Sequence, residues 1–267
     1  MWEGEEIGKT KLMQHVIPTG DHKPIRQKQY PIPSIAREKM TQQVNEMLEN
    51  ELIRPSNSPW CSPVLQAKRK LPDGTIKYRF CVDLKKVNSV TVKDSYSIPR
   101  INDTVEALSG AKYYTTMDVD RAFRQVCLVE EDKSKTAFLV GGKLYEFNVM
   151  PFGSMNASST FQRLMDRVLR ELPWKQCLVY IDDFLIFSST FEQHLKDIDE
   201  VLARFAYAGL KLKPSKCSFA DGQVDYLGYK ITAQGVQITT AKIDAILKIK
   251  PPETTENLFQ FLCFVFC

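Results

Sequence analysis

Hydrophobic residues follow two periods along this chain, one typical of helices and one typical of strands. Apolar positions three or four residues apart predict helices over residues 34–50, 100–108, 156–172 and 191–208. Ser34 is the expected N-cap of the first helix, and Gly209 the glycine that ends the last one. These helices are long enough to cover a sheet with their apolar faces.

Strands are predicted where short apolar runs lie between turn residues. One hairpin is expected over residues 62–84, around Leu71-Pro72-Asp73-Gly74, and another around Gly141-Gly142. Short strands are expected near Ser218–Phe219 and over Gln223–Ile231. Because strands and helices alternate without a regular βαβ repeat, the pattern predicts an α+β fold.

Two adjacent aspartates, Asp182 and Asp183, interrupt an apolar run that extends over residues 178–187. Such a run predicts a pair of buried strands or a tight hairpin. Burying an unpaired carboxylate costs several kcal/mol (order of magnitude), so the pair calls for a cation, and a divalent metal is the natural one. A turn that points both side chains into water is the alternative. Asp118, which follows a similar apolar run at Tyr113–Met117, argues against that alternative.

Three acidic oxygen donors on a sheet suit phosphoryl transfer with two metal ions, in which two Mg²⁺ bracket the reacting phosphorus. We expect Asp118 and Asp182 to supply the bridging ligands, with the backbone carbonyl of Val119 as a further oxygen, and Mn²⁺ to substitute for Mg²⁺. Successive strand residues face opposite sides, so Asp183 shares the site only if the hairpin turns there. It therefore ranks below the other two.

Composition narrows the class of protein only slightly. The 43% hydrophobic and 25% charged content is ordinary for a soluble globular chain. The net charge of +4 is concentrated in residues 1–100, which suits contact with a polyanion, although ordinary scatter explains it too. Seven cysteines without a CxxC pair indicate reduced, buried thiols in an intracellular protein, cytoplasmic or nuclear. No apolar run approaches the ~18 residues of a membrane span.

Several motifs in a fixed order resemble the reverse transcriptases of gypsy-type LTR retrotransposon Pol polyproteins. The resemblance extends from about His15 to about Phe261. The motifs that carry it are Ser58-Pro59-Trp60-Cys61-Ser62-Pro63, Arg79-Phe80-Cys81-Val82-Asp83, residues 118–126, Met150-Pro151-Phe152-Gly153, Phe161-Gln162-Arg163, Tyr180-Ile181-Asp182-Asp183 and Tyr226-Leu227-Gly228. The resemblance implies an RNA-directed DNA polymerase that adds dNTPs to a primer on an RNA or DNA template.

The resemblance also implies a right-hand polymerase architecture. Residues 1–33 would form an extended arm, 34–112 mainly the fingers, 113–230 mainly the palm with a fingers portion at about 127–150, and 231–267 a partial thumb and the start of a connection segment. The protein partners and oligomeric state are not implied.

Roles for single residues follow from the same resemblance. Phe123 matches the aromatic gate under the sugar, which favours dNTPs by excluding a 2′-hydroxyl, although core packing explains the ring equally well. Phe152-Gly153 matches the nucleotide-binding loop, and Gln162 a supporting polar residue or else a surface glutamine. Tyr226-Leu227-Gly228 resembles the primer grip.

The basic residues are matched in the same way. Arg79 and one of Lys68, Arg69 or Lys70 match the triphosphate clamp of the fingers, with a solvated basic hairpin as the alternative. Lys216 matches a lysine that protonates pyrophosphate as a general acid, or else is a surface lysine.

Some residues depart from the family pattern. Asp120, Arg121 and Arg124 stand next to the metal site where relatives commonly carry small or different polar residues. Asp103, Asp166 and Glu192 have no matched role and are expected on helix surfaces. The sequence drifts from the connection segment after Leu262, which suggests a fragment or decayed copy. A catalytically dead, nucleic-acid-binding remnant is therefore the second hypothesis, and a palm-type nucleotide cyclase a distant third.

Overall fold

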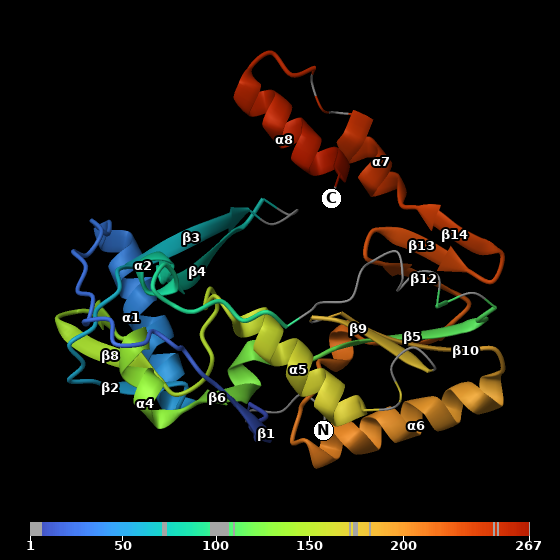
Figure 1. The fold of residues 1–267 in the computed structure, drawn as a ribbon, viewed down its shortest axis with the longest axis horizontal. Helices are drawn as coiled ribbons and strands as arrows, with labels where there is room; N and C mark the ends of the chain where they lie inside the picture. The colour runs from blue at the N-terminus through green and yellow to red at the C-terminus, as the bar shows by residue number, and fades with distance from the viewer. Residues whose placement is uncertain are drawn as a thin grey trace.

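The computed structural model describes residues 7–70, 74–96, 107–108, 110–170, 172, 176–181, 183–247, 249 and 251–266. It has two main parts, seen on the left and right of Figure 1, with a smaller C-terminal part above them. The sheets are mostly antiparallel and are packed against helices, so the predicted α+β class is confirmed.

The first part carries the basic hairpin of the chain. Helix α1 (Ser34–Glu49) packs beside the hairpin β3 (Val64–Lys70) and β4 (Ile76–Val82) and beside the sheet β2-β8-β7. In that sheet β2 covers Ile53–Pro55, β7 Phe138–Val140 and β8 Lys143–Phe147. Short helices α2 (Lys85–Asn88), η2 (Ser134–Thr136) and α4 (Glu130–Lys133) complete this part. Its core includes Met40, Val44, Trp60 and Phe138.

The second part is built on a four-stranded sheet in the order β11-β5-β10-β9. These strands are β5 (Tyr113–Asp118), β9 (Cys177–Tyr180), β10 (Asp183–Ser188) and β11 (Ser218–Asp221). Helices α5 (Ala157–Leu169) and α6 (Phe191–Tyr207) cover one face of the sheet, and the hairpin β12 (Gln223–Tyr226) and β13 (Tyr229–Thr232) lies over the other (Figure 1).

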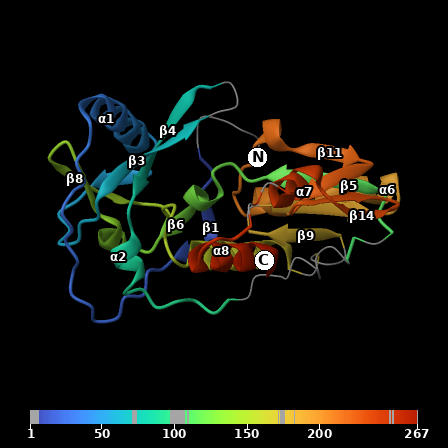
Figure 2. The same ribbon diagram turned by 90° about the horizontal axis from the view of Figure 1, so that it is seen from above.

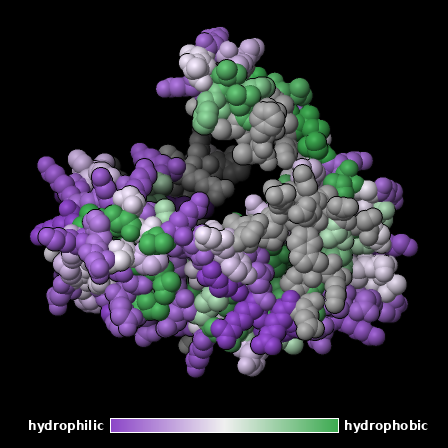
Figure 3. Space-filling view, viewed as in Figure 1, coloured by the Kyte–Doolittle hydropathy of each residue, from purple (hydrophilic) through white to green (hydrophobic). Residues whose placement is uncertain are grey.

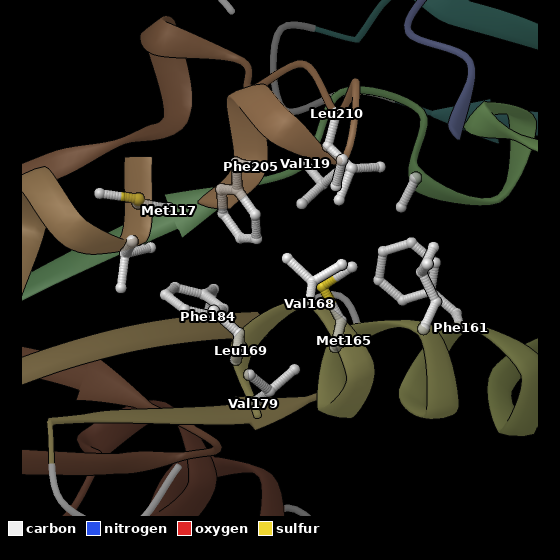
Figure 4. Close-up of a cluster of buried hydrophobic side chains, with 14 of the residues drawn as sticks. Met117, Val119, Phe161, Met165, Val168, Leu169, Val179, Phe184, Phe205 and Leu210 are labelled. Atoms are coloured by element: carbon white, nitrogen blue, oxygen red, sulfur yellow. The ribbon is translucent and has the colours of Figure 1, made fainter. Parts of the chain in front are cut away.

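Alternation along β10 explains how one sheet supports two cores. Phe184 and Ile186 point into the helical core, where Phe184 meets Phe205 of α6 with ring centroids 5.2 Å apart (Figure 4). Leu185 and Phe187 point to the opposite core, which contains Tyr226. Both faces are buried, so the strand reads as a continuous apolar run in the sequence. Asp183 begins this strand and shares the face of Leu185.

The N-terminal segment contains a strand that sequence patterns did not indicate. Strand β1 (Thr10–His15) pairs in parallel with β6 (Val126–Leu128), which follows the short helix η1 (Ala122–Gln125). His15 is fully buried and its ring nitrogens bond Thr160 and Ser154 at 2.9 and 2.8 Å. Burial lowers the pKa of His15 to about 4, so the ring is neutral at physiological pH.

The C-terminal elements extend away from the rest of the protein. A third strand, β14 (Gly235–Ile238), joins the β12–β13 hairpin and leads to α7 (Thr240–Leu247) and α8 (Thr255–Phe266). The space-filling view shows an open gap between α7–α8 and the part that carries β3–β4 (Figure 3), and the view from above places α8 over the middle of the molecule (Figure 2).

Most predicted elements are confirmed, with some corrections. Helix α1 begins at Ser34 itself, with Pro33 at the N-cap, so the predicted serine cap is wrong. The strand expected over Gln223–Ile231 is two strands, because Leu227 and Gly228 form a turn with φ of 51° and 81°. Helix α5 ends three residues before the predicted Leu172. The helix expected over residues 100–108 and the turn at Leu71-Pro72-Asp73 lie almost wholly outside the described residues.

The prediction of reduced, buried cysteines is only partly confirmed. All five whose side chains are described are free thiols. Cys61 and Cys177 are buried, but Cys81, Cys127 and Cys217 are half-exposed. In the part of the chain that the structure describes, no helix combines the length and apolarity needed to cross a membrane.

Candidate active site

Two aspartates meet where β5 ends and β10 begins. The antiparallel register pairs Asp118 directly with Asp183, so both carboxylates lie on the same face of the sheet. They line a cleft of about 250 Å³, whose other wall includes Tyr226 and Leu227 of the β12–β13 hairpin. The hairpin therefore turns at the point that Asp183 requires to share the site, which meets the condition that the sequence analysis set for this residue.

The surroundings of Asp183 in this cleft shift its pKa. Burial, and then the charge of Asp118, raise the pKa of Asp183, whereas Lys216 acts in the opposite direction. Two carboxylates facing each other repel, so a cation between them would offset the part of the shift that comes from Asp118.

Lys216 brings a cation to this pair. It lies in the short helix η3 (Pro214–Lys216), and its Nζ donates to Oδ2 of Asp118 at 2.8 Å. Its side chain is 57% exposed, which leaves the ammonium free to move. Sequence reasoning left open whether Lys216 is a surface lysine; it is exposed, but it lines the cleft.

The chain leaves β5 through an isolated bridge between Val119 and Leu212. The bonds of this bridge run from Lys213 N–H to the Asp118 carbonyl and from Asp120 N–H to the Lys211 carbonyl, both 2.9 Å long. The Val119 carbonyl takes no part in the bridge, so this oxygen can act as a ligand as the sequence predicts.

A buried glutamine supports the turn between β9 and β10. Gln162 is only 1% exposed, so its interpretation as a surface residue is wrong. Its Oε1 accepts the N–H of Ile181 at 3.1 Å, and Ile181 adopts φ = 57°, a conformation that a β-branched residue rarely takes. Asp182, the next residue, lies outside the described part of the chain.

Three phenylalanine rings pack together after the end of β5. Phe123 of η1 is half-buried, with ring centroids 5.4 Å from Phe152 and 5.9 Å from Phe161. Phe152 is 55% exposed, and the Arg124 guanidinium lies 5.9 Å from its ring centre. Burial lowers the pKa of Arg124. Phe123 is thus packed against two rings and remains partly exposed.

Two hydrogen bonds of the Asn88 side chain hold the loop that carries Phe152 and Gly153. Asn88 donates its Nδ2 to the Gly153 carbonyl at 2.8 Å and accepts from the Met155 N–H at 3.1 Å. Gly153 has φ = 86°, and a Cβ there would meet nothing within 4 Å. Glycine is therefore required for backbone conformation and not for space.

The expected clamp residues lie apart from the cleft, on the β3–β4 hairpin of the other part. Arg79 is exposed and pairs with Ala67, so the two share one face of the hairpin. Position 69 falls on that face by alternation, whereas positions 68 and 70 fall on the other.

The charged departures at Asp120 and Arg121 approach to 3.8 Å beside the site, and Arg121 takes a left-handed φ of 46°.

The Tyr226-Leu227-Gly228 turn lies directly against the β9–β10 hairpin. Tyr226 is 3% exposed and its hydroxyl donates to the Asp183 carbonyl at 3.4 Å. The two-residue turn that follows has positive φ at both positions, as right-twisted hairpins require. Asp225, which sequence reasoning did not single out, also lines the cleft.

The donor set suits a divalent cation. Two paired carboxylates and the Val119 carbonyl, which takes no part in the bridge, are the hard oxygen ligands that such ions prefer. Among the described residues no three His, Cys, Asp or Glu side chains gather closely enough to hold a metal ion. A third carboxylate could come from Asp182, outside those residues.

Replacing Lys216 with methionine is expected to raise the pKa of Asp183 further. The ammonium favours the charged carboxylate, so its removal shifts the equilibrium toward the protonated form. A carboxyl ¹³C NMR titration without metal measures this shift. Lys196→Met, on the exposed side of α6, is the matched control and should leave the titration unchanged. An unaltered Asp183 titration in Lys216→Met would show that the lysine does not act on this pair.

Comparisons with known proteins assign this arrangement to a family. Residues 67–231 match the family model described as "Reverse transcriptase (RNA-dependent DNA polymerase)". The chain is 42% identical over 247 residues to the retrovirus-related Pol polyprotein from transposon opus of Drosophila melanogaster, covering 92% of this chain and 25% of that one. The Pol polyprotein from transposon gypsy of the same organism is 36% identical over 248 residues, covering 92% and 24%. The chain thus spans about a quarter of these relatives.

Solved structures support the same assignment. A foamy viral protease–reverse transcriptase in complex with double-stranded DNA superposes with a TM-score of 0.86 at 26% identity, covering 99% of this chain and 46% of the other. A complex of the foamy viral enzyme with an RNA/DNA hybrid gives 0.83 at 25% identity, covering 98% and 35%. The predicted right-hand polymerase fold is therefore confirmed. The chain belongs to the reverse transcriptase family, as the domain found in gypsy-type and other LTR retrotransposon Pol polyproteins.

Proposed function

We propose that this chain is an RNA-directed DNA polymerase domain that adds dNTPs to the 3′-hydroxyl of a primer. The observation that carries the proposal is the pairing of Asp118 with Asp183 across β5 and β10, in a cleft closed by the Tyr226–Leu227 turn. Paired acidic oxygens next to a wall of apolar and backbone groups suit nucleotidyl transfer at a primer end.

Asp118, Asp183 and the carbonyl of Val119, together with Asp182, would hold two Mg²⁺ ions, and Mn²⁺ would substitute. When bound, such ions lower the pKa of the attacking hydroxyl and stabilise the charge on the phosphate. Lys216, which bonds Asp118, would release it and deliver a proton to the pyrophosphate. Tyr226, Leu227 and Gly228 would hold the primer end against the site.

The dNTP would lie between the cleft and the β3–β4 hairpin. Phe123 would lie under its sugar and the Phe152–Gly153 loop beside it, with Gln162 supporting the catalytic turn. Of the three candidates for the second clamp cation, the register favours Arg69, because position 69 shares the hairpin face of Arg79 and positions 68 and 70 do not. Guanidinium groups would neutralise the triphosphate charge.

The template and primer would be RNA or DNA. The similar foamy viral enzymes were solved in complex with double-stranded DNA and with an RNA/DNA hybrid. The gap between α7–α8 and the β3–β4 part offers the duplex a place over the cleft (Figure 3).

The test is incorporation of dTTP on an oligo(dT)-primed poly(rA) template. We expect incorporation with Mg²⁺ or Mn²⁺, and loss of it when EDTA removes the metal, because the carboxylates alone cannot stabilise the charge on the phosphate. Restoring the metal should restore incorporation, which separates chelation from unfolding. If the parent chain binds the primed template but adds no nucleotide with either metal, the nucleic-acid-binding remnant replaces the polymerase as the correct description.

A further inference from the structure

Asp166 is an acidic residue to which sequence reasoning gave no role beyond the surface of a helix. It is only partly exposed, and both of its carboxylate oxygens accept hydrogen bonds. One accepts from the Tyr96 hydroxyl at 2.5 Å, and the other from Nε2 of Gln162 at 3.2 Å. Gln162 and Asp166 are one turn apart on α5, so their side chains are neighbours on the same side of the helix.

The bond from Gln162 to Asp166 determines which way the glutamine amide points. An amide has a donor end and an acceptor end, and a carboxylate accepts only. With its nitrogen held by Asp166, Gln162 presents its oxygen to the N–H of Ile181, 3.1 Å away. The reversed amide would set its own N–H groups against that N–H and leave both unpaired.

Ile181 needs this partner because it lies in the turn between the two catalytic strands. Its φ of 57° is costly for a β-branched residue and persists only where surrounding contacts hold it. Gln162 also approaches the Val179 carbonyl of β9 at 3.5 Å, so it contacts both the turn and the strand before it. Asp183 begins β10 two residues after Ile181.

Tyr96, at the other end of this hydrogen-bond network, is also held in place. Arg163 lies 4.5 Å from the ring centre of Tyr96 and bonds both oxygens of Asp94 at 2.9 and 2.8 Å. Burial, and then Asp166, raise the pKa of Tyr96 to about 12, so its hydroxyl keeps the proton that it donates. Tyr96 and Asp166 therefore form a stable anchor for Gln162.

We infer that Asp166 is a positioning residue for the catalytic turn, acting through Gln162 on the backbone of Ile181. Asp166 touches neither the cleft nor its aspartates, so it affects the reaction only by fixing the amide that holds the turn. The inference rests on the proposed polymerase function for its kinetic test, but not for its structural one.

Three variants separate an acceptor role from packing. Asp166→Asn keeps an amide oxygen that can accept from Gln162, and we expect its kcat to stay within about twofold of the parent. Asp166→Leu keeps the size and loses the acceptor, and should lower kcat by about tenfold with little change in the KM for dTTP. Asp199→Leu, on an exposed face of α6, is the matched control and should change neither.

A double-mutant cycle tests whether the effect passes through the glutamine. If Asp166 acts only by orienting Gln162, then Asp166→Leu combined with Gln162→Leu should be no slower than Gln162→Leu alone. Losses that multiply in the double variant would overturn the inference. So would an Asp166→Leu variant with the kcat of the parent.

Hydrogen exchange of the segment 176–187 provides a measurement independent of activity. Asp166→Leu and Gln162→Leu should exchange faster there than the parent, while Asp166→Asn should match it. Unchanged exchange in Asp166→Leu would contradict the inference. If the parent extends no primer, the exchange data still decide the role of Asp166, and only the proposed polymerase function fails.

Discussion

Replacing Asp118 with asparagine is expected to reduce primer extension by about 10³-fold or more. Asparagine keeps the size of the side chain but removes the charge that would hold a metal against the reacting phosphate. A 10³-fold loss in kcat corresponds to about 4 kcal/mol of lost transition-state stabilisation. Single-turnover incorporation of dTTP on the primed poly(rA) template measures it, because this experiment reports the chemical step without product release.

The matched control is an aspartate of the same sheet that lies outside the cleft. Asp221 ends β11, which pairs with β5, and its carboxylate accepts from Ser218. Asp221→Asn should therefore keep the activity of the parent. If Asp118→Asn and Asp221→Asn were equally active, Asp118 would have no part in the chemistry, and the proposed polymerase site would be wrong.

The second aspartate of the pair should show a separate effect on stability. Since the folded state raises the pKa of Asp183, folding favours its protonated form. Stability contributed by this group is thus lost as pH rises from the ordinary value through the raised one. Asp183→Asn, which resembles the protonated form, should lose activity and yet be more stable than the parent at neutral pH without metal. Thermal unfolding at pH 4 and pH 7 checks this sign.

The sequence predicts the β9–β10 hairpin well because the apolar pattern of the sequence and the burial in the fold agree there. An apolar run on either side of Asp183 can be satisfied only by strands buried on both faces, and this is how β9 and β10 pack. The turn at Gly141 and Gly142 was equally clear, since both residues take positive φ, which glycine adopts without cost.

Other features depend on contacts between distant segments and leave no local signal. Leu227 takes φ = 51° although leucine does not indicate a turn, because the hairpin is fixed by its packing against the four-stranded sheet. Strand β1 pairs with β6 more than 100 residues later in the chain. Gln162 and Asp166 look like ordinary helix residues until β9 and Tyr96 are placed beside them.

Replacing Phe123 with valine is expected to reduce discrimination between dTTP and UTP by about 10- to 200-fold. Phe123 is half-buried, and its ring packs against those of Phe152 and Phe161. A shorter side chain would leave room for a ribose 2′-hydroxyl, and one small group in a shaped site is typically worth a factor of this size. The ratio of kcat/KM for the two nucleotides on poly(rA) measures the change.

The same substitution distinguishes the gate from the alternative that Phe123 is only a core residue. A gate predicts altered sugar selectivity together with a modest loss of stability, because valine still fills part of the space between the neighbouring rings. A core residue predicts lower stability with the selectivity ratio of the parent. Phe191→Val, on α6 and 44% exposed, is the matched control and should leave the ratio unchanged. Both hypotheses predict some loss of stability, but only the gate predicts a changed ratio of kcat/KM for dTTP and UTP. Selectivity therefore decides between them even if Phe123→Val unfolds at a temperature several degrees below that of the parent.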